Sequence, residues 1–111
     1  MTEVISNEEL EQKLEQSVAP RVTKDAIKSR IKSTDFIRIG QTVTLCSITL
    51  DNGYSVRGES ACVNPANYNK EIGEKISFDN AFDKLWPLYG FLLAEDQLLA
   101  QVPVSKEDEA A

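Results

Sequence analysis

Gly58–Tyr89 reads GESACVNPANYNKEIGEKISFDNAFDKLWPLY, and the rest of the chain is organised around it. The stretch begins as the end of a strand, crosses the asparagine-rich turn Asn64–Asn69 and continues as a helix from about Lys70 to Trp86. At about 100° per residue, the large apolar side chains of that helix cover roughly half of its circumference. Pro87 has no amide proton, so we expect the helix to kink or restart there. The segment therefore predicts a strand that leads directly into a long, kinked C-terminal helix.

Two segments rich in β-branched residues, 42–50 and 54–61, lie before the turn and predict an antiparallel hairpin. The residues between them, Asp51-Asn52-Gly53, allow two registers. A two-residue loop would place apolar residues opposite polar ones, whereas a three-residue loop would pair Ile48 with Val56. We favour the second register because it matches apolar side chains across the strands.

Two features of the hairpin need an explanation beyond simple alternation. Gly58 lies inside the second strand, where glycine marks the close approach of another backbone or of a ligand. Val43 and Leu45 are at odd-numbered positions and Ile48 is at an even-numbered one. Because successive side chains of a strand point to opposite faces, Val43 and Leu45 would lie on the other face from Ile48. This indicates either a bulge near Cys46-Ser47 or a sheet that is covered on both faces.

A pair of short helices is predicted before the hairpin. The first, at about residues 7–18, begins with a capping box, and the second is capped by Thr23 and buries Ile27 and Ile31. Residues 35–40 are expected to form a short connector. The predicted fold is α+β: an antiparallel β-hairpin or small sheet packed with a short N-terminal helix pair and a long kinked C-terminal helix.

The charge is concentrated at the two ends of the chain, which has 111 residues and a net charge of −6. We expect an acidic helical extension over residues 1–20, a single α+β domain over 21–100 and a disordered acidic tail over 101–111. Acidic ends disfavour binding to duplex nucleic acid. No run of apolar residues is long enough to span a membrane and no leader is recognisable, so a cytosolic protein is expected.

The residue types present disfavour catalysis. The chain has no histidine, and Cys46 and Cys62 are its only cysteines, without a CxxC spacing. Zinc sites, histidine-based catalysis and a Cys–His dyad are therefore disfavoured, and both cysteines are expected to be small core residues. Asp79 and Asp83 lie four residues apart on the predicted helix, but no third metal ligand follows at a recognisable spacing. We expect no enzyme activity, no metal and no cofactor.

The asparagine-rich turn is the candidate ligand site. Tyr68 is an aromatic residue among amides, next to a helix start whose free N–H groups favour anions. An aromatic ring that can stack on a base, beside helix N–H groups that can bind a phosphate, is an arrangement that suits a nucleotide. The same residues can be explained without a ligand. The asparagines would then shape the turn, the helix carboxylates would form structural ion pairs, and the lysines and arginines would be solvated at the surface. The candidate ligand-binding residues are Arg30, Arg57, Asn64, Asn67, Tyr68, Asn80 and Lys84.

Two stretches of the sequence, LDNGYSVRGESACVNPANYNKEIG and ISFDNAFDKLWPLYGFLL, resemble a known phage family. The runs GESAC, NPANYNKEIG and LWPLYG occur in the same order and at the same spacing as in that family. It is the small tailed-phage protein family named after gene product forty-nine of coliphage N-four and gene sixty-six of Shigella phage Sf-six. The resemblance covers about Val22–Leu93 and leaves out the N-terminal helix and the acidic tail.

The resemblance implies a phage gene product made in the cytoplasm of an infected bacterium. The family is similar in fold to the first Thoeris anti-defence protein, a sponge that binds the cyclic signal nucleotide of a bacterial immune system without cleaving it. The function implied is sequestration of a small anionic nucleotide, without catalysis, by a homodimer or higher oligomer. The alternative is an acidic protein-interaction module that binds and inhibits a host protein.

Overall fold

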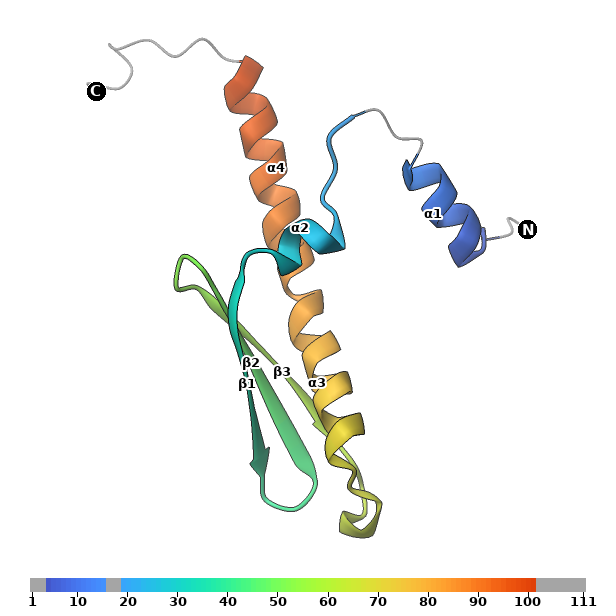
Figure 1. Cartoon of the computed structure of the whole chain (residues 1–111), viewed down its shortest axis with the longest axis vertical. Helices are drawn as coiled ribbons and strands as arrows, with labels where there is room; N and C mark the ends of the chain where they lie inside the picture. The colour runs from blue at the N-terminus through green and yellow to red at the C-terminus, as the bar shows by residue number, and fades with distance from the viewer. Residues whose placement is uncertain (1–3, 16–18, 102–111) are drawn as a thin grey trace.

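The computed structural model describes residues 4–15 and 19–101 and has an α+β fold, as predicted (Figure 1). Helix α3 lies along a three-stranded antiparallel sheet, and α4 continues beyond the end of that sheet (Figure 1). The elements in order are α1 (Asn7–Glu15), α2 (Lys24–Lys28), β1 (Ile31–Ile39), β2 (Val43–Leu50), β3 (Ser55–Ala61), the 3-10 helix η1 (Pro65–Asn67), α3 (Lys70–Asp83) and α4 (Leu85–Gln101).

The hairpin between β2 and β3 has the predicted three-residue loop. Ile48 pairs with Val56 and Cys46 pairs with Gly58, so apolar positions face one another across the two strands. Gly53 closes the turn with a φ of +91°, a left-handed conformation that favours glycine. The cross-strand pairs and the turn residue thus select the same register.

The prediction of a connector over residues 35–40 was wrong. Residues up to Ile39 belong to β1, which pairs with β2 from Ile31↔Leu50 to Ile39↔Val43, so the sheet has the order β1-β2-β3. Ile31 was predicted on a helix but begins this strand, because α2 ends at Lys28. Strand β1 is an edge strand, and most of its side chains are exposed, so it lacks the alternating pattern that marks a half-buried strand.

The proposed bulge near Cys46-Ser47 is also absent. The pairing of β2 with β3 is continuous across those residues. Val43 and Leu45 are half-buried on the face opposite α3, where Ile37 and Ile39 of β1 pair with them. Apolar residues occur at both odd and even positions of β2 because the sheet carries apolar side chains on both faces.

The face that α3 buries includes Phe82, as the apolar arc predicted, but differs from the predicted face in the first half of the helix. Gly73, Ser77 and Ala81 lie against the sheet, whereas Ile72 and Ile76 remain 58% and 44% exposed. The reason lies in β3. An ideal Cβ built on Gly58 would come within 2.2 Å of the backbone nitrogen of Ala81. The close approach predicted at Gly58 is confirmed, and it is the backbone of α3 that approaches. Only small residues fit where the backbones of α3 and β3 meet.

The core is completed around this contact by side chains from α2, the sheet and the two long helices. Trp86, part of the apolar arc that should face the core, is 37% exposed at the rim, where its ring packs edge-on against Phe82 with the centroids 6.0 Å apart. The buried hydrophobic residues are Ile27, Cys46, Ile48, Leu50, Val56, Ala81, Phe82 and Leu85.

The long C-terminal helix is bent, as expected, but the break lies at Lys84, ahead of Pro87. A proline in a helix removes the hydrogen bond to the carbonyl four residues earlier, which here is that of Asp83, and its ring collides with that carbonyl. The chain therefore interrupts the helix one turn before Pro87. The proline then falls within the first turn of α4, where a missing N–H is tolerated.

The two ends of the chain were predicted as helix and tail. Helix α1 covers Asn7–Glu15 with every side chain exposed, and residues 16–18 of the predicted helix lie outside the described residues. The tail predicted to be disordered lies outside them as well, from residue 102 onward, while Gln101 ends α4.

The two cysteines are predicted to react differently with a thiol reagent. Burial raises the pKa of the Cys46 thiol to about 11, and its side chain has no exposed surface, whereas Cys62 is half-buried. At pH 8 we expect one thiol per chain to react with Ellman's reagent in the folded protein and two in denaturant, because the thiolate is the reactive form. Cys62→Ser should remove the fast reaction. Two fast thiols in the folded protein would contradict the burial of Cys46.

Candidate functional site

A small hollow of about 90 Å³ lies where η1 and the first turn of α3 meet the sheet. Strands β2 and β3 provide one wall, and the asparagine-rich turn and α3 provide the other. Its lining side chains include Thr42, Thr44, Ser60, Asn67, Tyr68 and Ile72.

The asparagines of the turn hold the backbone around this hollow. Asn64 Oδ1 accepts a hydrogen bond from the N–H of Ala66 at 2.9 Å and caps η1. Asn69 Oδ1 accepts one from the N–H of Ile72 at 3.1 Å and caps α3. The turn chemistry expected of the asparagines is thus side-chain capping at Asn64 and Asn69. Asn67 lies between the two caps and lines the hollow.

The Tyr68 side chain is half-buried and is contacted by residues of two strands, β1 and β2. Thr44 Oγ1 donates a hydrogen bond to Tyr68 Oη at 3.4 Å. The guanidinium carbon of Arg38, on β1, lies 3.6 Å from the centroid of the tyrosine ring, close enough for a cation–π interaction. Arg38 also donates to the carbonyl oxygen of Gln41 at 2.6 Å. One face of the ring is therefore covered by a fixed positive charge.

Arg38, the charged residue that contacts Tyr68, was not predicted from the sequence, nor were the hydroxyl residues of the hollow, Thr42, Thr44 and Ser60. Arg38 lies within the stretch that was interpreted as a connector, so no face was assigned to it. Recognising residues 31–39 as a strand would have placed Arg38 opposite Thr44, in register with the β2 residue that contacts Tyr68. The signal available in the sequence was the pair of β-branched and aromatic residues at Phe36 and Ile37 followed by Ile39.

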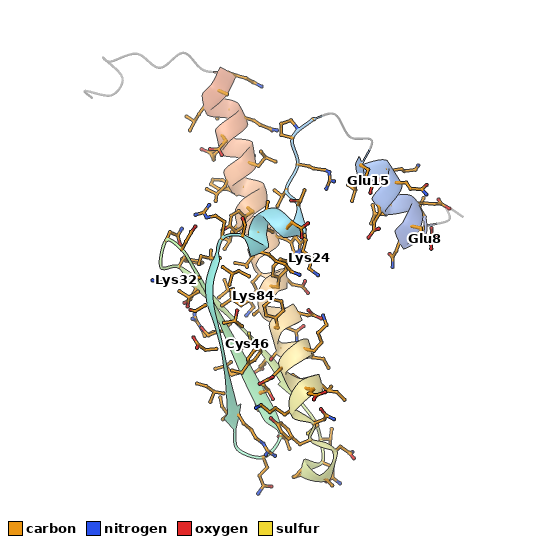
Figure 2. The ribbon with its side chains drawn as sticks, viewed as in Figure 1. Glu8, Glu15, Lys24, Lys32, Cys46 and Lys84 are labelled. Carbon is orange, nitrogen blue, oxygen red and sulfur yellow. The ribbon has the colours of Figure 1, made fainter. Side chains whose placement is uncertain are left out.

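Three of the predicted site residues, Arg57, Asn80 and Lys84, gather at a different place. Lys84 Nζ donates to the carbonyl oxygen of Arg57, and Asn80 Nδ2 donates to that of Glu59 at 2.8 Å. Lys84 lies beside the junction of α3 and α4 (Figure 2). These contacts fasten the C-terminal end of α3 to β3, so in this structure the polar groups hold the helix in place.

Arg30 pairs with Asp51 in the β2–β3 turn, whereas Tyr68 follows η1. The β2–β3 turn and η1 lie at opposite ends of the sheet (Figure 1). Arg30 Nε lies 2.7 Å from Oδ2 of Asp51, and its guanidinium lies 5.8 Å from the centroid of the Tyr89 ring. The hydrogen bond from Arg30 lowers the pKa of Asp51. Arg30 is thus not brought together with the asparagine-rich turn.

Loss of the α3 cap is expected to weaken the fold. Asn69→Ala removes the hydrogen bond to the N–H of Ile72, and such substitutions cost about 1 kcal/mol of unfolding free energy. Urea denaturation followed by circular dichroism measures the change. Asn67→Ala in the same turn is the matched control and should change stability by less than about 0.5 kcal/mol. An Asn69→Ala variant as stable as the parent would contradict the capping role.

The arrangement provides hydroxyls, an amide, an aromatic ring and a guanidinium, which are groups that bind a ligand. In residues 4–15 and 19–101, no three histidine, cysteine, aspartate or glutamate side chains are grouped so as to hold a metal ion. Asp79 Oδ2 lies 2.7 Å from Nζ of Lys75 on the same helix, so this carboxylate forms an ion pair within α3. Over the same ranges, no helix has the length and hydropathy needed to cross a membrane.

Comparison with known proteins identifies the family. The model of the phage protein (N4 Gp49/phage Sf6 gene 66) family matches residues 22–97, a range that contains the sheet, the asparagine-rich turn, α3 and most of α4. No curated protein and no solved structure matched the chain significantly. Since the family match covers more than half of the chain, the protein belongs to the phage protein (N4 Gp49/phage Sf6 gene 66) family.

Proposed function

We propose that this phage protein binds and sequesters a small anionic cyclic nucleotide, an immune signal of the infected bacterium, without cleaving it. In this proposal it acts in the host cytoplasm and counteracts anti-phage defence. The observation that supports it most is the Arg38 guanidinium stacked 3.6 Å from the Tyr68 ring, beside a hollow at the start of α3. The resemblance to a Thoeris anti-defence protein supports the same ligand class.

Hydrogen-bond donors near the hollow, and the guanidinium that stacks on its lining residue Tyr68, can serve an anion. A guanidinium offers several N–H donors in a planar fork that matches the oxygen atoms of a phosphate. The first N–H groups of a helix have no intrahelical acceptor, and those of Lys70 and Glu71 precede the capped N–H of Ile72. The hydroxyls of Thr42 and Ser60 line the hollow and can donate to a ligand oxygen.

The size of the hollow limits which part of the ligand enters it. About 90 Å³ is well below the roughly 300 Å³ of the smaller pockets that enclose a whole ligand. The hollow therefore suits one phosphate or ribose group, and the base would lie on the exposed side chains of Ile72 and Ile76 that line its edge. Full burial of the nucleotide requires a homodimer or higher oligomer, which is part of the proposal.

Isothermal titration calorimetry tests the proposal, with a panel of cyclic ADP-ribose isomers and cyclic dinucleotides as titrants. We expect a saturable heat with at least one member, because sequestration demands tight binding, together with a rise in melting temperature. Absence of both heat and thermal shift for every member of the panel would remove the proposal.

A second candidate is a module that binds a host protein. It is favoured by the large apolar side chains exposed on α4 and by the acidic ends of the chain. Pull-down from host lysate, followed by reconstitution with the purified partner, discriminates between the two. A stoichiometric host partner combined with no small-molecule binding would favour this candidate over the first.

A further inference from the structure

Helix α1 stands apart from the rest of the domain, and none of its residues is buried (Figure 1). It is nine residues long, and an isolated helix shorter than about 12–15 residues is only marginally stable in water. Leu10 and Leu14, four residues apart on one side of α1, are 44% and 36% exposed. The helix therefore needs a surface on which to pack. Because the family match begins at residue 22, α1 lies outside the region that the family model describes.

A hollow of about 430 Å³ separates α1 from the base of α4. Glu11, Leu14 and Glu15 line it from α1, and they share one face of that helix because they are three and four residues apart. Val22 and Trp86 are apolar residues on the opposite side of the hollow. Trp86 is 37% exposed there, so the surface nearest to α1 is itself apolar and incompletely covered.

One hydrogen bond already fastens α1 beside this hollow. Arg21 Nε donates to the carbonyl oxygen of Leu14 at 3.1 Å. The last carbonyls of a helix have no intrahelical donor, and they form its negative end, so a guanidinium is a favourable partner for them. The bond holds the C-terminal end of α1 in place, and a rotation of the helix about this end would bring its lining face onto Trp86.

Opposite charges face one another across the hollow. Helix α1 has four glutamates and one lysine, a net charge of −3, whereas residues 21–32 have five basic residues and one acidic residue, a net charge of +4. Glu11 and Glu15 line the hollow on one side, and Arg21 and Lys24 line it on the other. In the part of the chain that the structure describes, no ion pair joins the two sides. Closure would bring these charges together.

We propose that α1 is a strap that closes on the domain, placing Leu14 against Trp86 and Val22. Because Arg21 holds the end of α1, Glu15 lies nearest to Arg21 in the closed state, and Glu11, one turn earlier, pairs with Lys24. The closed strap fills the hollow and covers Trp86, so it controls whether this surface is available to a partner. The inference does not rest on the proposed nucleotide binding.

Fluorescence of Trp86 tests the closure, because it is the one tryptophan of the sequence. Quenching by acrylamide is measured on the full-length protein. Leu14→Glu should raise the quenching constant roughly twofold or more and shift the emission to longer wavelength, because a charge would then face the apolar contact with Trp86. The far-ultraviolet circular dichroism of the domain should change little, since Leu14 lies outside the core.

Gln12→Glu is the matched control for this substitution. It adds the same charge to the same helix, but Gln12 lies about 160° around α1 from Leu14 and does not line the hollow. Its quenching constant should equal that of the parent. The proposal would be overturned if Leu14→Glu were quenched no more than the parent, or if the two variants were quenched alike.

A charge exchange tests the expected ion pair. Glu11→Lys should raise the quenching of Trp86, and the added substitution Lys24→Glu should return it towards the parent value. The expected change is smaller than for Leu14→Glu, because exposed ion pairs contribute little. Glu9→Lys with Lys24→Glu is the control and should not be restored, since Glu9 does not line the hollow. Equal quenching of the two double variants would contradict the pairing of Glu11 with Lys24.

Discussion

Gly58→Ala is expected to destabilise the protein by about 3 kcal/mol or more, a large part of the stability of a domain of this size. The added Cβ would lie 2.2 Å from the nitrogen of Ala81, 2.6 Å from the carbonyl oxygen of Ser77 and 2.7 Å from the carbonyl carbon of Asn80. All three are backbone atoms of α3, so no side-chain rotation relieves the overlap. The helix has to move off β3, which opens the core. Urea denaturation followed by circular dichroism measures the loss.

Gly90→Ala is the matched control for this substitution. Gly90 lies within α4, and a Cβ built on it meets no atom within 4 Å. Alanine is favoured over glycine in a helix by about 0.5–1 kcal/mol, so this variant should be slightly more stable than the parent. If Gly58→Ala were as stable as Gly90→Ala, the close contact of α3 with β3 would not hold the fold together.

Arg38→Ala is expected to lower the affinity for the nucleotide by roughly 100-fold or more. The substitution removes the positive charge and the planar donor group that stack on Tyr68, and it frees the face of the ring that the guanidinium covers. Arg38→Lys should recover only part of the affinity, because an ammonium group makes neither the stacked nor the forked contact. Calorimetry with the best ligand of the panel provides the measurement.

Arg57→Ala separates the two groups of predicted site residues. Arg57 belongs to the cluster with Lys84, and the carbonyl that Lys84 contacts is kept in the variant. Its affinity for the nucleotide should match that of the parent. Loss of binding in Arg57→Ala, with full binding in Arg38→Ala, would move the ligand to the junction of α3 and α4.

The parts of the fold that local chemistry determines could be predicted from the sequence. The hairpin register depends on pairs such as Ile48 with Val56 and on Gly53 in its turn, all close in sequence. Strand β1 could not be recognised, because an exposed edge strand is not constrained to alternate. The buried face of α3 was assigned to its largest apolar residues. This was right for Phe82, but Gly73, Ser77 and Ala81 are buried in place of Ile72 and Ile76, because Gly58 on β3 allows the two backbones to touch.

The same distinction applies to the candidate site. The caps at Asn64 and Asn69 act within three residues, so residue type alone indicates capping in this turn, although it does not say which asparagines cap. The partner of Tyr68 could not be predicted, because Arg38 is 30 residues away and lies on the strand that was missed. Arg30 was assigned to the site from its charge alone, and its ion pair with Asp51 places it elsewhere. Whether Arg30 or Arg38 contacts Tyr68 depends on how elements far apart in the sequence pack together, which local sequence patterns do not determine.

Recovery of the bound molecule tests sequestration most directly. The protein is incubated with a cyclic nucleotide from the panel, freed of unbound ligand and denatured by heat, and the released molecule is identified by mass spectrometry. If the protein sequesters a cyclic nucleotide, we expect that nucleotide to be released intact, in a fixed ratio to protein, and Arg38→Ala to retain little of it. Release of a hydrolysed product, or of no nucleotide from any member of the panel, would contradict sequestration.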